Sequence, residues 1–162
     1  MKKYCMPIIL FGCIMMLAGT KLMAQDYKTL PPIIITPTTS YVPEKVWKSF
    51  QSYCTNAQNA EWYRLNKKFL VKYMTEDKKN QAVFGKRGRL IYNISYGYEN
   101  NLPEEIRKQV KSTYYDYNIT GAIKVTQSKR TIWVVNVEDA KKMILVRLED
   151  GDMDEIENYN KI

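Results

Sequence analysis

The densest group of chemically active side chains is a run of acids near the C-terminus, at Asp150, Asp152, Asp154 and Glu155. Carboxylate oxygens are the ligands that Ca²⁺ prefers, so this run is a candidate calcium site. It lacks the central glycine and the distant acid of a calcium-binding loop. On a strand, alternate residues share a face, and the run is then more simply a solvated strand with Lys or Arg partners. We therefore expect no metal site.

The other reactive groups are not arranged for catalysis. The 162-residue chain contains no histidine, which excludes Ser-His-Asp and Cys-His mechanisms and every histidine-bearing zinc site. It has no glycine-rich phosphate cradle, no Gly-x-Ser-x-Gly elbow and no Ser-x-x-Lys placed on a predicted helix. Ser, Thr, Lys, Asp, Glu and Tyr remain available, so the missing histidine alone does not exclude catalysis. We expect a protein that is not an enzyme and that binds no cofactor.

The N-terminus has the layout of a secretory signal peptide. A Lys-Lys start precedes the apolar stretch 6–18, and Ala24 offers a small residue at the cleavage point. We expect residues 1–24 to be removed and the mature protein to be periplasmic or secreted. A lipoprotein cut before Cys13 and an uncleaved membrane anchor are the alternatives. The apolar stretch is shorter than the ~20 residues that span a bilayer, so we expect no transmembrane span after cleavage.

Basic residues outnumber acidic ones by 25 to 17, which gives a formal net charge of +8. Basic pairs recur in predicted turns with tyrosines between them, a pattern that is also found in single-strand nucleic-acid binders. An exported protein rarely meets nucleic acid, so we expect none as a partner. Attraction of the basic turns and tyrosines to an anionic envelope ligand, a glycan or a lipid head group, is the stronger alternative. The basic pairs are Lys67-Lys68, Lys78-Lys79, Lys86-Arg87, Lys129-Arg130 and Lys141-Lys142.

Residues 25–42 are predicted to be a proline-containing linker, and residues 43–162 a single domain. The linker is either an extended tether or a docking strand, built on the isoleucines at 33–35, that pairs with a partner's sheet edge. In the domain, apolar residues follow a helical spacing over 43–57 and 103–115. Each of these segments begins with proline and has an acid in its first turn.

The remaining segments of the domain have a hydrophobic period of two, which predicts hairpins in series. The predicted fold class is α+β, an antiparallel β-meander with two helices on one face. The expected order is helix, three or four strands, helix, three or four strands.

Several short motifs of the domain match a known family of exported proteins. They are Trp62 after the first helix, the alternation of Phe69, Val71 and Tyr73, the turn Lys86-Arg87-Gly88, the helix start Leu102-Pro103-Glu104, the helix end Tyr114-Tyr115 and the hairpin Glu149-Asp150-Gly151. In these motifs the chain resembles the PepSY-like family, whose fold is related to that of the beta-lactamase-inhibitor protein. The resemblance covers about residues 43–160. It implies an envelope location, no cofactor and no catalysis. The best-understood relative of this fold binds an enzyme through the exposed face of its sheet, but this chain has one copy of the unit where that inhibitor has two, so beta-lactamase inhibition is not expected here.

The strand alternation also divides the apolar residues between the two faces of the sheet. We expect the helices to cover one face, made of Phe69, Val71, Tyr73, Leu90, Tyr92, Ile94, Trp133, Val135, Val137, Ile144, Val146 and Leu148. A face that is merely solvated should be mostly polar, yet the opposite face keeps several aliphatic residues. An exposed apolar patch with a polar rim marks an interaction site.

We therefore predict a partner-binding surface on the open face of the sheet. Its expected anchors are Ile132, Val134, Met143 and Leu145, and its expected polar rim is Lys72, Asn93, Asn136 and Arg147. The partner would be an unknown envelope protein. A homodimer through this face would satisfy the same pattern, and so would the ordinary preference of strands for β-branched residues.

Overall fold

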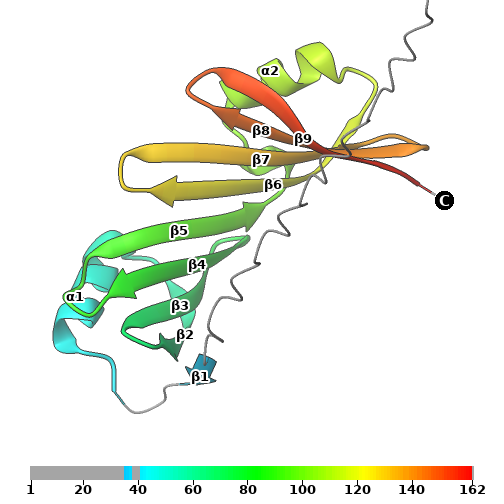
Figure 1. Cartoon of the computed structure of the whole chain (residues 1–162). Coiled ribbons are helices and arrows are strands. Elements are labelled where there is room, and N and C mark those ends of the chain that lie inside the picture. The colour runs from blue at the N-terminus through cyan, green and yellow to red at the C-terminus, as the bar shows by residue number, and fades with distance from the viewer. Residues whose placement is uncertain (1–34, 38–40, 162) are drawn as a thin grey trace, which may run out of the picture. The chain divides into compact units, whose positions relative to one another are not determined.

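The computed structural model describes residues 35–37 and 41–161, which form one antiparallel sheet of nine strands with two short α-helices. Each strand pairs with the next one along the chain (Figure 1). The predicted signal peptide, Cys13 and the first two isoleucines of the linker lie outside the described residues. The elements are β1 (Ile35–Pro37), α1 (Glu44–Tyr53), β2 (Gln58–Leu65), β3 (Lys68–Thr75), β4 (Lys78–Gly85), β5 (Leu90–Gly97), the 3₁₀ turn η1 (Glu99–Asn101), α2 (Glu104–Thr113), β6 (Asn118–Gln127), β7 (Arg130–Glu138), β8 (Lys142–Glu149) and β9 (Asp152–Asn160).

The predicted fold class, with helices alternating with groups of strands, is wrong. The described chain begins with a strand, because β1 precedes α1 and pairs with β2 at the edge of the sheet. Proline is tolerated at the edge of a sheet, so Pro37 does not prevent this pairing. The nine strands then form one uninterrupted sheet, and each helix has only ten residues. The described residues are therefore mostly β-strand, and two short helices pack on the single sheet.

Both helices are shorter than the sequence predicts, although they begin where expected. Pro43 and Pro103 immediately precede them with φ angles of −54° and −56°, which is the backbone geometry that the proline ring imposes. Each helix has glutamate in its first turn, where the positive end of the helix dipole favours an acid.

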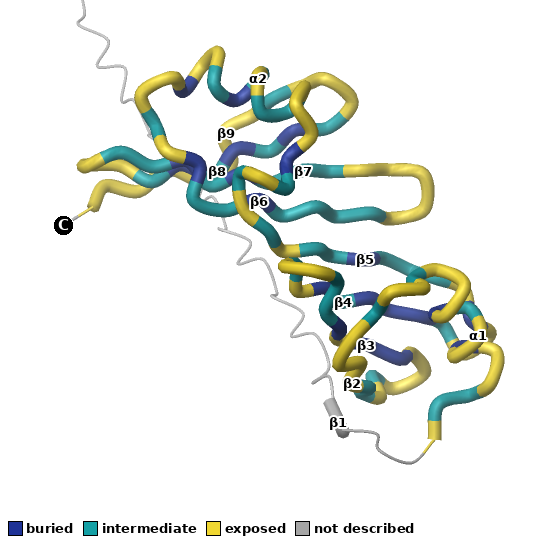
Figure 2. Tube along the Cα trace, turned by 180° about the vertical axis from the view of Figure 1, so that it is seen from behind, coloured by how far each residue is buried: buried dark blue, intermediate teal, exposed yellow. Residues whose placement is uncertain are grey.

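Two separate buried clusters hold the helices against the sheet. Val46 and Phe50 of α1 pack on β3 and β4, whereas Val110 of α2 packs on β6, β7 and β8. In Figure 2, buried residues lie along β3 and β4 and again along β7 and β8, and β5 and β6 between them contain fewer buried residues. The register places both clusters on the same side of the sheet, which we call the helix side. Its largest fully buried side chains are Phe84, Leu148, Val46, Val71, Val110, Val135, Val137 and Val146.

Candidate functional site: the uncovered face of the sheet

The face opposite the helix side is defined by the strand register, because residues paired across antiparallel strands point the same way. Val134 lies between Ile123 and Arg147, and Asn136 lies opposite Leu145. None of these residues belongs to the clusters packed under α1 and α2. We call this surface the open face. Its residues are Leu70, Lys72, Val83, Tyr92, Ile94, Tyr96, Ile123, Val125, Ile132, Val134, Asn136, Met143, Leu145 and Arg147.

Six of the eight predicted partner-binding residues lie together on this face. All six are partly exposed, so they contribute both apolar surface and polar groups that a second molecule can reach. They come from two neighbouring strands, with Ile132, Val134 and Asn136 on β7 and Met143, Leu145 and Arg147 on β8.

Lys72 lies on the same face but far from those six residues. It belongs to β3, four strand spacings from β7, which corresponds to ~19 Å across the sheet. Its ammonium lies 4.8 Å from the ring centre of Tyr63, and Glu61 lies opposite it on β2. Lys72 therefore borders the other end of the open face and cannot form a rim around the β7–β8 residues.

The placement of Asn93 on the binding surface is wrong, because this residue faces the helix side. It is 5% exposed, and its side chain accepts a hydrogen bond from the Tyr73 hydroxyl. The cause is a β-bulge in β5: Phe84 pairs with Leu90 and Val83 with Tyr92, which leaves Ile91 as an extra residue. A bulge reverses the alternation that follows it.

The alternation also predicts Tyr92 and Ile94 on the helix side, and because of the same bulge this prediction is wrong. Both lie on the open face, since Tyr92 pairs with Val83 and Ile94 with Val125. Together with Tyr96 and Ile123 they extend the apolar surface of β7 and β8 across β5 and β6. The polar residues Asn93 and Ser95 at the intervening positions fit the predicted alternation, so the sequence of β5 carries no signal of the reversal.

A pocket of about 360 Å³ opens on this surface near its centre. Tyr96, Ile123, Val134 and Leu145 contribute apolar walls, and Asp77 and Lys79 add one charge of each sign. Asn136 also lines the pocket. Its amide nitrogen donates to the Thr120 hydroxyl at 2.9 Å, while its carbonyl oxygen is buried without a partner among the described residues. Because that oxygen is enclosed by the protein, it adds no acceptor to the surface of the pocket.

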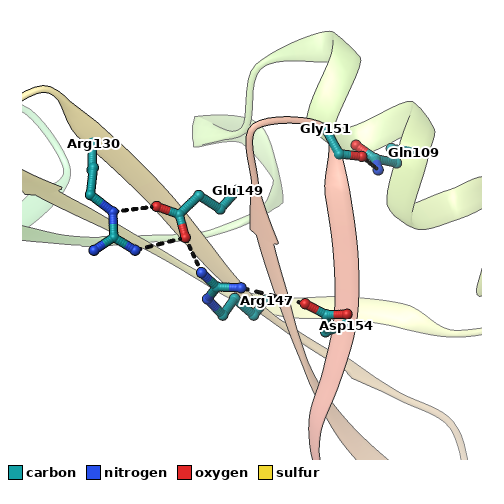
Figure 3. A network of polar contacts seen from close by, with 6 residues as sticks. All are labelled: Gln109, Arg130, Arg147, Glu149, Gly151 and Asp154. Carbon is teal, nitrogen blue, oxygen red and sulfur yellow. Dashed lines mark hydrogen bonds and ion pairs between the residues drawn. The ribbon is translucent and has the colours of Figure 1, made fainter.

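A network of ion pairs closes one end of the open face (Figure 3). Arg130 donates to both oxygens of Glu149 at 2.7 and 3.0 Å, and Arg147 also donates to Glu149. Arg147 further pairs with Asp154 of β9 at 3.4 Å. The Glu149 side chain is only 10% exposed. Arg147 is therefore held and largely neutralised by its own chain, which makes it a fixed border of the surface.

The acidic run does not converge on a common point. Asp154 faces Arg147 on the open face, whereas Glu155 accepts a hydrogen bond from the Tyr114 hydroxyl at 2.7 Å on the helix side. Burial, with this hydrogen bond as the second cause, holds the pKa of Tyr114 well above its usual value. Within residues 35–37 and 41–161, no group of three or more Cys, Asp or Glu side chains is placed to hold a metal ion. No helix in the same ranges is long and apolar enough to cross a membrane.

Comparison with known proteins gives structural relatives only. No protein-family model matches the chain, and no curated protein matches it. A BLIP-like protein from Bacteroides fragilis is 15% identical with a TM-score of 0.57, covering 75% of this chain and 89% of its own. A DUF2874 family protein from Bacteroides ovatus is 14% identical with a TM-score of 0.56 and the same coverage. A protein from Bacteroides eggerthii, described as a candidate periplasmic protein, is 11% identical with a TM-score of 0.54, covering 75% and 90%. These likenesses show that the chain has a BLIP-like fold.

Proposed function

We propose that this chain is a non-enzymatic binding module of the bacterial envelope that engages a protein partner through its open face. The observation that carries this proposal is the apolar surface of β5 to β8, which neither helix covers and which contains a pocket at its centre. Protein interfaces concentrate their binding energy in such apolar centres, where a few side chains fill pockets inside a polar rim.

Within this surface, Val134 and Leu145 are the central anchors because both line the pocket. Ile132 and Met143 extend the apolar area along β7 and β8. Asp77 and Lys79 supply one charge of each sign on the pocket wall. The partner side chain that fits has an apolar body.

The location and the family are parts of the same proposal. The signal-peptide layout of residues 1–24 supports export to the periplasm, and the structural relative described as a candidate periplasmic protein agrees with it. The motifs shared with the PepSY-like family support assigning residues 43–162 to that family, and the BLIP-like fold is compatible with this assignment. By fold-level analogy alone, the relative named BLIP-like also favours binding over catalysis.

The test is affinity capture from an envelope extract of the producing cell on immobilised residues 25–162, at low and high salt. Val134→Asp with Leu145→Asp places two charges in the open face. The matched control, Tyr41→Asp with Tyr115→Asp, places two charges at side chains that are 75% and 76% exposed. We expect one protein to be retained at high salt by the wild type and the control but not by the open-face variant.

Two other results would each favour a different binding partner. Retention only at low salt, insensitive to the open-face variant, would favour the anionic envelope ligand, because exposed charges are screened by salt. Concentration-dependent self-association that the open-face variant abolishes, measured by sedimentation, would identify a second copy of the chain as the partner.

A further inference from the structure

The helix side of the sheet carries a second pocket, in the stretch that separates the two buried clusters. Its volume is about 430 Å³, within the range of sites that hold small molecules. Its lining is mostly polar, whereas the lining of the open-face pocket is mostly apolar. The residues that define its chemistry are Lys78, Asn80, Asn93, Ser95, Lys124 and Trp133.

The charged side chains that line this pocket are both basic. Lys78 and Lys124 line it, and no Asp or Glu does. Across residues 35–37 and 41–161, neither lysine has a carboxylate within ion-pairing distance, although eight other pairs form. Asp77 precedes Lys78 in the chain and feels its charge, but its carboxylate is hydrogen-bonded to the Asn101 amide at 3.2 Å and does not line this pocket. Two unpaired cations beside a concave surface attract a small anion.

The wall between the lysines offers neutral hydrogen-bonding groups that are already fixed in place. Asn80 is 5% exposed, and its amide nitrogen donates to the Thr75 hydroxyl and the Lys78 carbonyl at 2.9 and 3.0 Å. No residue in the described ranges donates to its side-chain oxygen. Asn93, also 5% exposed, accepts from Tyr73 and donates to the Ser95 hydroxyl. These groups keep free capacity both to accept and to donate hydrogen bonds.

The pocket also has an aromatic wall. The indole of Trp133 lines it, and the Lys124 ammonium lies 5.6 Å from that ring's centre. A flat apolar surface next to a cation suits a ligand with a hydrocarbon ring face and a nearby negative charge. An inorganic anion would use the lysines but would leave the aromatic wall and the amides unused.

We propose that this pocket binds a sugar acid, a monosaccharide unit that carries a carboxylate. The carboxylate pairs with the ammonium groups of Lys78 and Lys124. The ring hydroxyls exchange hydrogen bonds with Asn80, Asn93 and Ser95, and the ring face lies against Trp133. The site is separate from the open face, so the chain carries a small-ligand site on one side of its sheet and a partner surface on the other.

The test is titration of residues 25–162 with glucuronate and galacturonate, followed by calorimetry and by the NMR signals of the Asn80 and Asn93 amide groups. Glucose tests the role of the carboxylate, and acetate and inorganic phosphate test the role of the sugar ring. We expect saturable binding of at least one sugar acid, with shifts of those two amides, and weaker or no binding of the three other probes.

The pocket variant is Lys78→Gln with Lys124→Gln, and the matched control is Lys48→Gln with Lys108→Gln, whose side chains are exposed on the helices. We expect the pocket variant to bind about tenfold more weakly or worse and the control to bind as the wild type does. Equal stabilities by thermal unfolding verify that both variants are folded. Binding of neither sugar acid, equal binding of acetate or phosphate, or equal loss in the control would each overturn the proposal.

Discussion

The hydroxyl of Tyr73 on β3 donates a hydrogen bond to the side-chain carbonyl of Asn93 on β5, 3.1 Å away and across the intervening strand β4. Both side chains are at least 95% buried. This bond gives the buried Asn93 oxygen a hydrogen-bond donor inside the helix side of the sheet. Burial is also the main cause that raises the pKa of Tyr73 well above its usual value, so the hydroxyl remains a donor throughout the physiological range.

Replacing Tyr73 by phenylalanine removes only that donor, and we expect the free energy of unfolding to fall by ~1–2 kcal/mol. The buried Asn93 oxygen then loses its partner. The measurement is equilibrium unfolding in urea. Tyr63→Phe is the control, because its hydroxyl donates to Glu61 at the exposed surface, where water can replace it. Equal losses in the two variants would contradict a special role for the Tyr73–Asn93 bond.

Periodicity in the sequence predicts the helix side correctly along β3, β7 and β8, where each apolar alternation runs without interruption. Phe69, Val135 and Ile144 are all in the buried clusters. The same reasoning fails in β5, because the extra residue Ile91 reverses the alternation. No pattern in the sequence predicts this bulge.

The predicted site is affected in the same way. Its β7 and β8 members lie together because they follow an unbroken register, whereas Asn93 moves to the other face. Lys72 is separated from them because strand order sets distance across a sheet, and alternation carries no information on strand order. The arrangement of the fold also escaped prediction, because the pairing of β1 with β2 is a long-range contact that no local sequence pattern specifies.

Glu149 is expected to matter more for stability than any exposed ion pair. Glu149→Gln removes the charge that binds Arg130 and Arg147 together, and it leaves two guanidinium groups side by side. Urea unfolding should show a loss of ~1–3 kcal/mol, because this carboxylate is mostly buried. In Glu44→Gln the pair with Lys48 is 71% and 77% exposed, and the change should stay within about 0.5 kcal/mol. A Glu149 variant as stable as the Glu44 variant would show that the network is only a surface feature.

The carboxylate of Asp139 makes the free energy of unfolding depend on pH. Its carboxylate accepts the backbone N–H groups of Lys141 and Lys142 at 2.7 and 2.6 Å, and these bonds lower its pKa below the usual 3.8. The folded state thus favours the ionised form. Its contribution is complete above the unfolded pKa and declines as the pH falls through the folded value. The difference in urea unfolding midpoint between wild type and Asp139→Ala should therefore be complete at pH 7 and shrink as the pH falls below the usual pKa of 3.8. A difference that grows on acidification would contradict this sign.

The cluster under α2 should respond strongly to truncation. Leu148 is 1% exposed, so Leu148→Ala should cost ~2–5 kcal/mol of unfolding free energy through lost burial and a residual cavity. Ile156 on the edge strand β9 is 47% exposed, and Ile156→Ala should cost less than ~1 kcal/mol. Thermal or urea unfolding distinguishes the two. Similar costs would mean that β9 is packed against something that the chain itself does not supply.

The most direct test of the open face is site-specific photo-crosslinking in the producing cell. A photoreactive aromatic residue is placed at Val134, at the centre of the open face, or at Tyr115, which is 76% exposed elsewhere. We expect illumination to link one envelope protein to the Val134 position and not to the Tyr115 position, and we expect Leu145→Asp in the same chain to abolish the product. The same product from both positions, or none from Val134 in a folded and exported protein, would contradict the open face as the binding surface.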